Sequence, residues 1–188
     1  WVTGVQTCAL PISLLASATG ILVCCYSSHP LVPLLAAATD VPVVGIFEAS
    51  LSTALLLLPH PDRCAFGIVS TGKVWEPLLA AGVARYLGAH ASDRFAAVET
   101  TGLSAVELHE TDEAEVRGRM VEATRRLVSR KDVGAVLLGC AGMVGMEDWV
   151  REACVLERGE VEGSKVRVVD GVKVGFAMLE ALVKAASI

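Results

Sequence analysis

Short apolar runs alternate along the chain with longer stretches in which apolar residues recur every three or four positions. The short runs are rich in Val, Ile and Leu and predict buried strands, whereas the longer stretches predict helices. The predicted strands are 20–25, 41–47, 65–70, 95–100, 133–139 and 166–169. Because strands that alternate with helices are typical of a parallel sheet, the pattern predicts an α/β fold.

One helix is predicted with particular definition, over residues 112–130. Its apolar residues recur at helical spacing: Val116, Met120, Ala123 and Leu127. The stretch begins with acidic residues and ends with basic ones, which suits the helix dipole. We interpret it as an amphipathic helix that covers the sheet, and we expect no chemistry from it.

Small or hydroxyl-bearing residues follow nearly every predicted strand, at 25–28, 70–72, 100–102 and 139–142. In open α/β sheets, ligands bind beyond the carboxyl ends of the strands, where helix N-termini offer free N–H groups. The four endings therefore predict one site for an anionic or carbonyl-rich ligand. The alternative is that small residues only permit tight strand-to-helix turns, and for any single turn this alternative stands.

The same arrangement occurs twice. An apolar run ending at Cys25 is followed by a helix and a second run over 43–45, and a run ending at Cys140 is followed by a helix and a run over 168–171. The second interval is ten residues longer, and we expect the charged stretch 157–165 to form the extra loop. The repeat predicts two similar lobes, each made of a parallel sheet flanked by helices, with a thiol from each lobe facing a shared cleft.

Charge, aromatic content and cysteine spacing restrict the partners, the metal content and the location that we expect for this protein. The chain of 188 residues has a formal net charge of -5 and only 5% aromatic residues, which disfavours a nucleic-acid partner. The six cysteines include no CxxC pair, so we expect free thiols, a reducing, cytoplasmic location and no metal site.

The first 39 residues contain no Asp, Glu, Lys or Arg, which raises the question of a membrane segment. Residues 8–26 are nearly long enough to span a bilayer. However, Pro11 and Gly20 interrupt the stretch and no basic segment precedes it. We favour the alternative, a strand buried on both faces of a parallel sheet, and expect no membrane partner.

Two opposed thiols suit one kind of chemistry in particular. Racemisation beside a carbonyl needs a base on one face of the carbon and an acid on the other, and the roles exchange for the other enantiomer. Cys25 and Cys140 each lie where a strand leads into a helix, so we expect helix N-termini to lower the pKa of both thiols toward neutrality. The remaining cysteines that we weighed are expected to be inert core residues, namely Cys8, Cys24, Cys64 and Cys154.

Five segments resemble motifs of the Asp/Glu/hydantoin racemase superfamily, especially its hydantoin and allantoin racemase-like branch: 25–31, 66–76, 100–103, 138–143 and 168–172. The resemblance runs from about Leu14 to the end of the chain and is carried most specifically by 138–143 together with a partner cysteine. It implies a metal-free, cofactor-free racemase of a hydantoin, allantoin or related amino-acid derivative, with Cys25 and Cys140 as the acid/base pair. By position it also implies substrate contacts from Ser27, Ser70, Thr71, Gly72, Thr100, Thr101 and Ala141. His29 would tune Cys25, serve the start of a helix, or pack.

The N-terminal segment departs from this pattern. Family members begin with a strand and an Asn-Pro-Asn-Ser/Thr-like turn, and residues 1–13 do not match it. We interpret 1–13 as foreign to the family, either an artefact of sequence assembly or a mispredicted start. The predicted organisation is then an incomplete first lobe over 14–62, joined by the C-terminal helix 171–188, and a second lobe over 63–170.

Three functions follow from these observations: a two-thiol racemase, a related decarboxylase or cis-trans isomerase, and an inactive ligand-binding remnant. Retention of a cysteine in both lobes favours the racemase. The expected partner is a small-molecule substrate, and homo-oligomer formation stays open.

Overall fold

The computed structural model describes residues 17–58, 63–88 and 92–186, so Cys8 and the segment 1–13 lie outside the described residues. The strands are β1 (Ile21–Val23), β2 (Val43–Gly45), β3 (Ala65–Ser70), β4 (Phe95–Thr100), β5 (Val133–Leu138) and β6 (Arg167–Asp170). The helices are α2 (Leu31–Ala38), α3 (Ile46–Leu57), α4 (Trp75–Leu87), α5 (Glu107–Glu110), α6 (Glu113–Val128), α7 (Glu147–Gly163) and α8 (Gly171–Ala186), with a 3₁₀ turn η2 (Ala141–Met143).

The strands form two parallel sheets. β1 pairs with β2, and the larger sheet has the order β4-β3-β5-β6. The prediction of an α/β fold with two parallel sheets flanked by helices is therefore confirmed.

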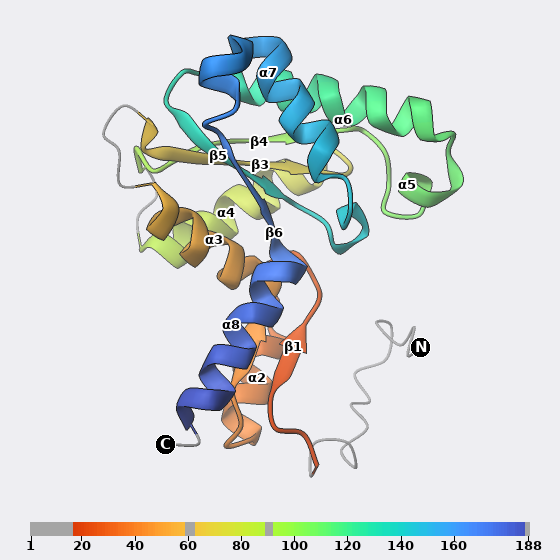
Figure 1. The fold of residues 1–188 in the computed structure, drawn as a ribbon. Helices are drawn as coiled ribbons and strands as arrows, with labels where there is room; N and C mark the ends of the chain where they lie inside the picture. Colours follow the sequence, from red (N-terminus) through yellow and green to blue (C-terminus); the bar gives the residue numbers. More distant parts are fainter. Residues whose placement is uncertain (1–16, 59–62, 89–91, 187–188) are drawn as a thin grey trace.

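The larger sheet is covered on both faces, with α6 and α7 on one side and α3 and α4 on the other (Figure 1). Alternate residues of β5 contribute to the two cores: Val136 and Leu138 pack under α6 and α7, whereas Ala135 and Leu137 pack with α3 and α4. Burial of both faces explains why this strand reads as a continuous apolar run.

The internal repeat is visible in the strand register. Val23 is paired with Gly45 at the end of β1 and β2, and Leu138 is paired with Asp170 at the end of β5 and β6. In both pairs a helix begins directly after the second strand, α3 after β2 and α8 after β6.

These two helices are exchanged between the sheets. α3 packs against β5 and β6 of the larger sheet, whereas α8 packs against β1 and β2 of the smaller one. α3 and α8 also pack against each other, and Figure 1 shows α8 extending from β6 down beside β1 and α2. The exchange ties the two sheets together.

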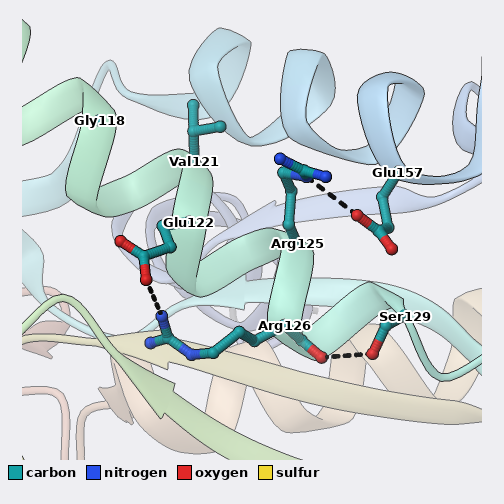
Figure 2. A pocket seen from close by; sticks show the side chains of 7 residues that line it. All are labelled: Gly118, Val121, Glu122, Arg125, Arg126, Ser129 and Glu157. Carbon is teal, nitrogen blue, oxygen red and sulfur yellow. Dashed lines mark hydrogen bonds and ion pairs between the residues drawn. The ribbon is translucent and has the colours of Figure 1, made fainter.

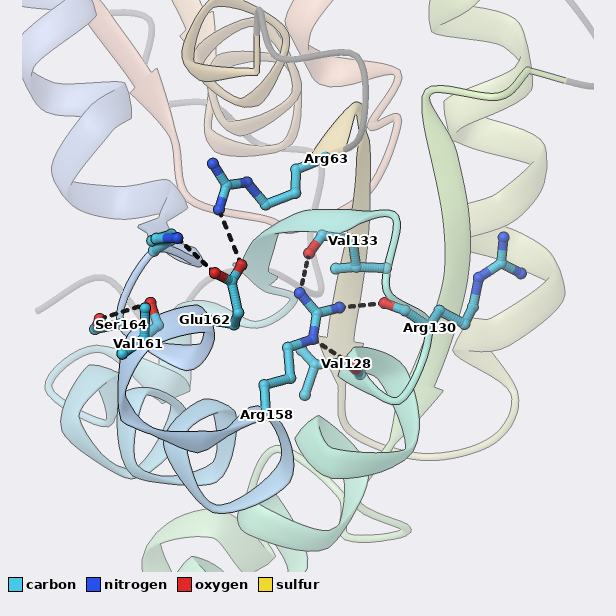
Figure 3. A network of polar contacts seen from close by, with 9 residues as sticks. Arg63, Val128, Arg130, Val133, Arg158, Val161, Glu162 and Ser164 are labelled. Atoms are coloured by element: carbon cyan, nitrogen blue, oxygen red, sulfur yellow. Dashed lines mark hydrogen bonds and ion pairs between the residues drawn. The ribbon is translucent and has the colours of Figure 1, made fainter.

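The predicted helix at 112–130 is confirmed as α6, and the side chain of Asp112 accepts a hydrogen bond from the Ala114 N–H at its start (2.9 Å). The prediction of a loop over 157–165 is wrong, because α7 extends to Gly163, with a kink at Gly159, whose φ of 77° is non-helical. Arg158 in this part of α7 donates hydrogen bonds to the main-chain carbonyls of Val128, Arg130 and Val133, which fixes α7 to the end of α6 and the start of β5 (Figure 3). The additional residues of the second interval therefore attach α7 to α6 and to the start of β5.

The ends of the two short strands also differ from prediction. The strand expected at 41–47 stops at Gly45, because Ile46 and Phe47 begin α3. β1 stops at Val23, so Cys24 does not follow the strand alternation and is exposed, not buried. Cys64 is half-buried where a core residue was predicted, whereas Cys154 is buried as predicted.

Within the described ranges, the longest apolar stretches of helix fall short of what a transmembrane crossing requires.

Candidate active site

The Cys140 turn begins at the end of β5 and is fixed by the neighbouring strand β3. The Gly139 N–H donates to the Val69 carbonyl (2.7 Å), and the buried Ser70 hydroxyl donates to the Gly139 carbonyl (2.8 Å). A Cβ at position 139 would lie 2.8 Å from the Val69 oxygen, so only glycine permits this close approach. The half-buried Cys140 follows directly and leads into η2.

The turns after β3 and β4 are bound to each other. The Thr101 N–H donates to the Ser70 carbonyl (2.9 Å), and the Gly102 N–H donates to the Thr71 carbonyl (3.0 Å). The Thr101 hydroxyl donates to the Thr71 carbonyl (3.4 Å) and accepts from the Leu103 N–H (3.2 Å). These predicted substrate-binding residues are therefore brought together, and the buried hydroxyls of Ser70 and Thr101 hold the turns in place.

Thr100 is directed elsewhere. Its hydroxyl donates to the Glu76 carboxylate of α4 (2.7 Å). Thr100 lines a cavity of about 360 Å³ together with charged residues, among them Lys73, Arg119 and Arg126. Its bond to Glu76 gives Thr100 a role in joining β4 to α4. Gly72 has open space around its Cα, so nothing crowds the end of β3.

The Cys25 turn follows β1. The Cys25 thiol lies 3.4 Å from the Ser27 hydroxyl, and the Ser27 N–H donates to the Cys25 carbonyl (3.0 Å). Between them, Tyr26 is buried edge-on against Phe47, and its hydroxyl contacts Ser50 at 2.8 Å. The buried tyrosine anchors the turn, so that the partly exposed Cys25 is held beside it.

His29 has a structural role of the kind that sequence analysis left open. Its Nδ1 accepts a hydrogen bond from the Leu31 N–H at the first residue of α2 (3.1 Å).

The two cysteine turns share surroundings. Tyr26, next to Cys25, and Ala141, next to Cys140, belong to the same apolar cluster. The thiols are close enough for charge on Cys25 to raise the pKa of Cys140. Cys25 and Cys140 therefore come from different sheets into one electrostatic environment, each two residues beyond the last residue of its strand.

The predicted lowering of the Cys140 pKa is wrong. Burial raises the pKa of this thiol and the neighbouring Cys25 adds to the rise, while a hydrogen bond from the Gly142 backbone acts in the opposite direction. The reason is local: Cys140 leads into a single 3₁₀ turn, and the long helix α7 begins only at Glu147, too far away for its dipole to act on the thiol.

Sequence reasoning missed two carboxyl groups at equivalent strand ends. Glu48 folds back over Gly45 at the end of β2, and its Oε2 is buried without a hydrogen-bond partner; burial raises its pKa. Asp170 at the end of β6 accepts from the Val172 N–H (2.8 Å), and its Oδ2 is likewise buried without a hydrogen-bond partner. The signal for Asp170 was its place just before a helix, whereas Glu48 lies inside an apolar helix start that gave no such signal.

A cavity of about 480 Å³ lies away from the thiols, between α6 and α7. Figure 2 shows its charged residues paired with neighbours, Arg125 with Glu157 and Arg126 with Glu122. It contains no nucleophile apart from Ser129, whose hydroxyl donates to the Arg126 carbonyl (2.8 Å). We assign this cavity no chemistry. Across the described part of the chain, no cluster of three or more His, Cys, Asp or Glu side chains is arranged to hold a metal ion.

Both the sequence and the fold of this chain have counterparts among known proteins. The sequence pattern described as Asp/Glu/Hydantoin racemase matches residues 7–179. The chain belongs to this racemase family. The matched range includes residues 7–13, part of the segment that sequence analysis set apart.

Relatives and solved structures of the racemase family are longer than this chain. An uncharacterized protein of Schizosaccharomyces pombe is 36% identical over 163 residues, which cover 87% of this chain and 62% of that protein. The crystal structure of allantoin racemase from Pseudomonas fluorescens is similar with a TM-score of 0.61 and 28% identity, over 78% of this chain and 54% of that one.

Allantoin racemase from Klebsiella pneumoniae has the same fold, with a TM-score of 0.72 and 24% identity over 93% of this chain and 63% of that one. The chain thus spans between 54% and 63% of the length of these proteins.

Proposed function

We propose that this protein is a cofactor-independent racemase of a hydantoin, allantoin or related amino-acid derivative, with Cys25 and Cys140 as its acid/base pair. One observation carries the proposal: two thiols occupy equivalent positions beyond the strands of two different sheets, on turns whose residues Tyr26 and Ala141 belong to one apolar cluster.

The chemistry requires only proton transfer. The thiolate of one cysteine removes the proton from the carbon beside a carbonyl, and the thiol of the other delivers a proton to the opposite face, so one proton leaves and one is gained. The negative charge that develops on the carbonyl oxygen would be stabilised by N–H groups of the strand-end turns. Because burial raises the pKa of Cys140, this thiol suits the protonated acid in the resting enzyme. Cys25, beside the Ser27 hydroxyl, then serves as the base, and the roles exchange for the other enantiomer.

The substrate class is supported by similarity. The sequence motifs around both cysteines resemble the hydantoin and allantoin branch, and the structure resembles an allantoin racemase at 28% identity. We therefore expect a cyclic or open-chain ureide with an acidic proton beside a carbonyl.

The test uses the complete chain in heavy water. Each enantiomer of allantoin and of 5-substituted hydantoins is incubated with the protein, and deuterium at the chiral carbon is followed by NMR together with optical rotation. We expect deuterium incorporation to accompany loss of rotation, above the uncatalysed rate. Neither signal with any of these substrates would contradict the proposed function.

Variants connect the activity to the two thiols. Cys25→Ser and Cys140→Ser should each reduce racemisation at least about a hundredfold, the usual contribution of a general acid or base. The matched control is Cys24→Ser, which removes an exposed thiol adjacent to Cys25 and should leave the rate unchanged. Full racemisation by either single-thiol variant would show that the assignment is wrong.

A further inference from the structure

A second titratable side chain lies at the Cys140 turn and comes from a different element. His109 is on the short helix α5, which packs against η2. Its Nε2 lies 3.0 Å, and the Cys140 Sγ 3.7 Å, from the position that a Cβ would take at Gly142. The imidazole and the thiol therefore approach the same point, and the absence of a side chain at Gly142 leaves the space between them open.

His109 is held in place by its helix although its side chain is exposed. Ser104 and Glu107 form a reciprocal cap: the Ser104 N–H donates to the Glu107 carboxylate (2.7 Å), and the Glu107 N–H donates to the Ser104 hydroxyl (3.2 Å). Leu108 is buried in the core under α6 and α7 together with Met143 of the Cys140 turn. The cap and the buried leucine fix α5 on both sides of the imidazole.

We propose that His109 is a positioning residue for Cys140, whose protonated imidazole stabilises the thiolate form of that cysteine. The proposal rests on the proposed function only in taking Cys140 as a reacting thiol. Burial disfavours the Cys140 thiolate, which must nevertheless form when Cys140 is the base. A positive charge on the His109 imidazole would offset part of that cost.

Few other titratable groups surround the Cys140 turn, so we assign the stabilisation of the Cys140 thiolate to His109. The other titratable groups on α5 are Glu107, which is engaged in the cap, and Glu110. The facing turn, residues 140–143, carries Cys140 as its titratable side chain, and beyond it Cys25 couples to Cys140. Only a protonated imidazole carries the positive charge, so the stabilisation should be larger at acidic than at alkaline pH.

The experiment measures thiolate reactivity separately at each cysteine. The full chain is alkylated with iodoacetamide across about pH 6 to 8.5, and the rates at Cys140 and Cys25 are read from their peptides by mass spectrometry. We expect His109→Gln to slow alkylation of Cys140 about two- to fivefold, the range for a partly exposed charge pair, with the larger effect at the acidic end. Cys25, in the same sample, should change less.

Three further variants separate charge from structure. His109→Lys should restore Cys140 reactivity and remove its extra pH dependence, because the charge is then permanent. Glu110→Gln changes a charge on the same helix and should leave Cys140 unaffected. Gly142→Ala would bring its Cβ to 3.0 Å from Nε2, displace the imidazole and reproduce the loss.

The outcomes are distinguishable. Equal slowing at both cysteines, or the same slowing in His109→Gln and His109→Lys, would overturn the role of His109 as a charge at Cys140. If no substrate is racemised but the Cys140-specific loss is observed, the proposed function fails and this inference stands. If racemisation is normal and Cys140 alkylates at the same rate in His109→Gln, the reverse holds.

Discussion

Gly139 offers the sharpest test of how the Cys140 turn is built. Replacement by alanine would place a Cβ 2.7 Å from Ile68 Cγ2, 2.8 Å from Ser70 Cβ and 2.8 Å from the Val69 carbonyl oxygen. Two of these contacts involve atoms fixed by the β3 backbone, so the end of β5 must move away from β3. The movement would stretch both hydrogen bonds that hold Gly139 to its neighbours.

The expected cost follows from these contacts. Overpacking of a buried position costs about 1–3 kcal/mol, and weakening the hydrogen bonds adds about 1 kcal/mol, so Gly139→Ala should lower the free energy of unfolding by about 2–4 kcal/mol. Gly118, exposed in the middle of α6 with nothing near its Cα, is the matched control. Gly118→Ala should raise the free energy of unfolding by up to about 1 kcal/mol through helix propensity.

Urea unfolding followed by circular dichroism measures both variants, with the slope of the transition compared as well as its midpoint. If Gly139→Ala unfolds within about 0.5 kcal/mol of the unmodified protein, the size expected of an ordinary surface change, the close packing of β5 against β3 is refuted.

Other predictions concern elements that position the site. Arg158→Met removes three hydrogen bonds to main-chain carbonyls and should cost about 2–4 kcal/mol in urea unfolding; a loss below about 1 kcal/mol would show that the clamp is not needed. Asp112→Ala removes the cap of α6 and should cost about 1 kcal/mol, with a fall in helix content on heating; no change would mean that water replaces the cap. Burial raises the Glu48 pKa in the folded state, so the folded state binds this proton more tightly and stability should fall as pH rises from the ordinary carboxyl range through the raised pKa. Glu48→Gln should flatten that part of the stability profile, and an unchanged slope would contradict the role of Glu48.

Sequence patterning predicted the larger sheet well because its central strands, β3 and β5, are buried on both faces. The runs that became β3 and β4 have the predicted bounds, and β5 ends one residue earlier than expected. A strand of this kind must be apolar throughout and must end where small residues begin, so its limits are visible in the residue order.

The errors in the predicted elements lie where contacts between distant parts of the chain determine the structure. Ile46 and Phe47 are as apolar as a strand requires, yet they start α3, because that helix leaves the smaller sheet and packs against the larger one. The charged stretch 157–163 predicted a loop, but Arg158 donates to carbonyls of α6 and β5, and helix continues beyond the kink at Gly159. Neither contact is local, so neither left a periodic signal.

For the candidate site, the residue order pointed to Cys25 and Cys140 through the internal repeat, and this assignment stays a prediction. The residue order did not reveal the electrostatic surroundings of the two thiols. The direction of the Cys140 pKa shift was wrong, because burial and the short η2 turn outweigh the expected helix dipole. His109 approaches Cys140 from 31 positions away in the chain, which no local pattern could reveal.

The central claim is that Cys25 and Cys140 act on opposite faces of one substrate carbon. Exchange of the α-proton in heavy water, measured for each enantiomer with Cys25→Ser and with Cys140→Ser, tests it most directly. We predict that a single-thiol variant exchanges the proton of one enantiomer at most, and that whatever exchange the two variants retain is for opposite enantiomers. Exchange of the same enantiomer by both variants would contradict the claim.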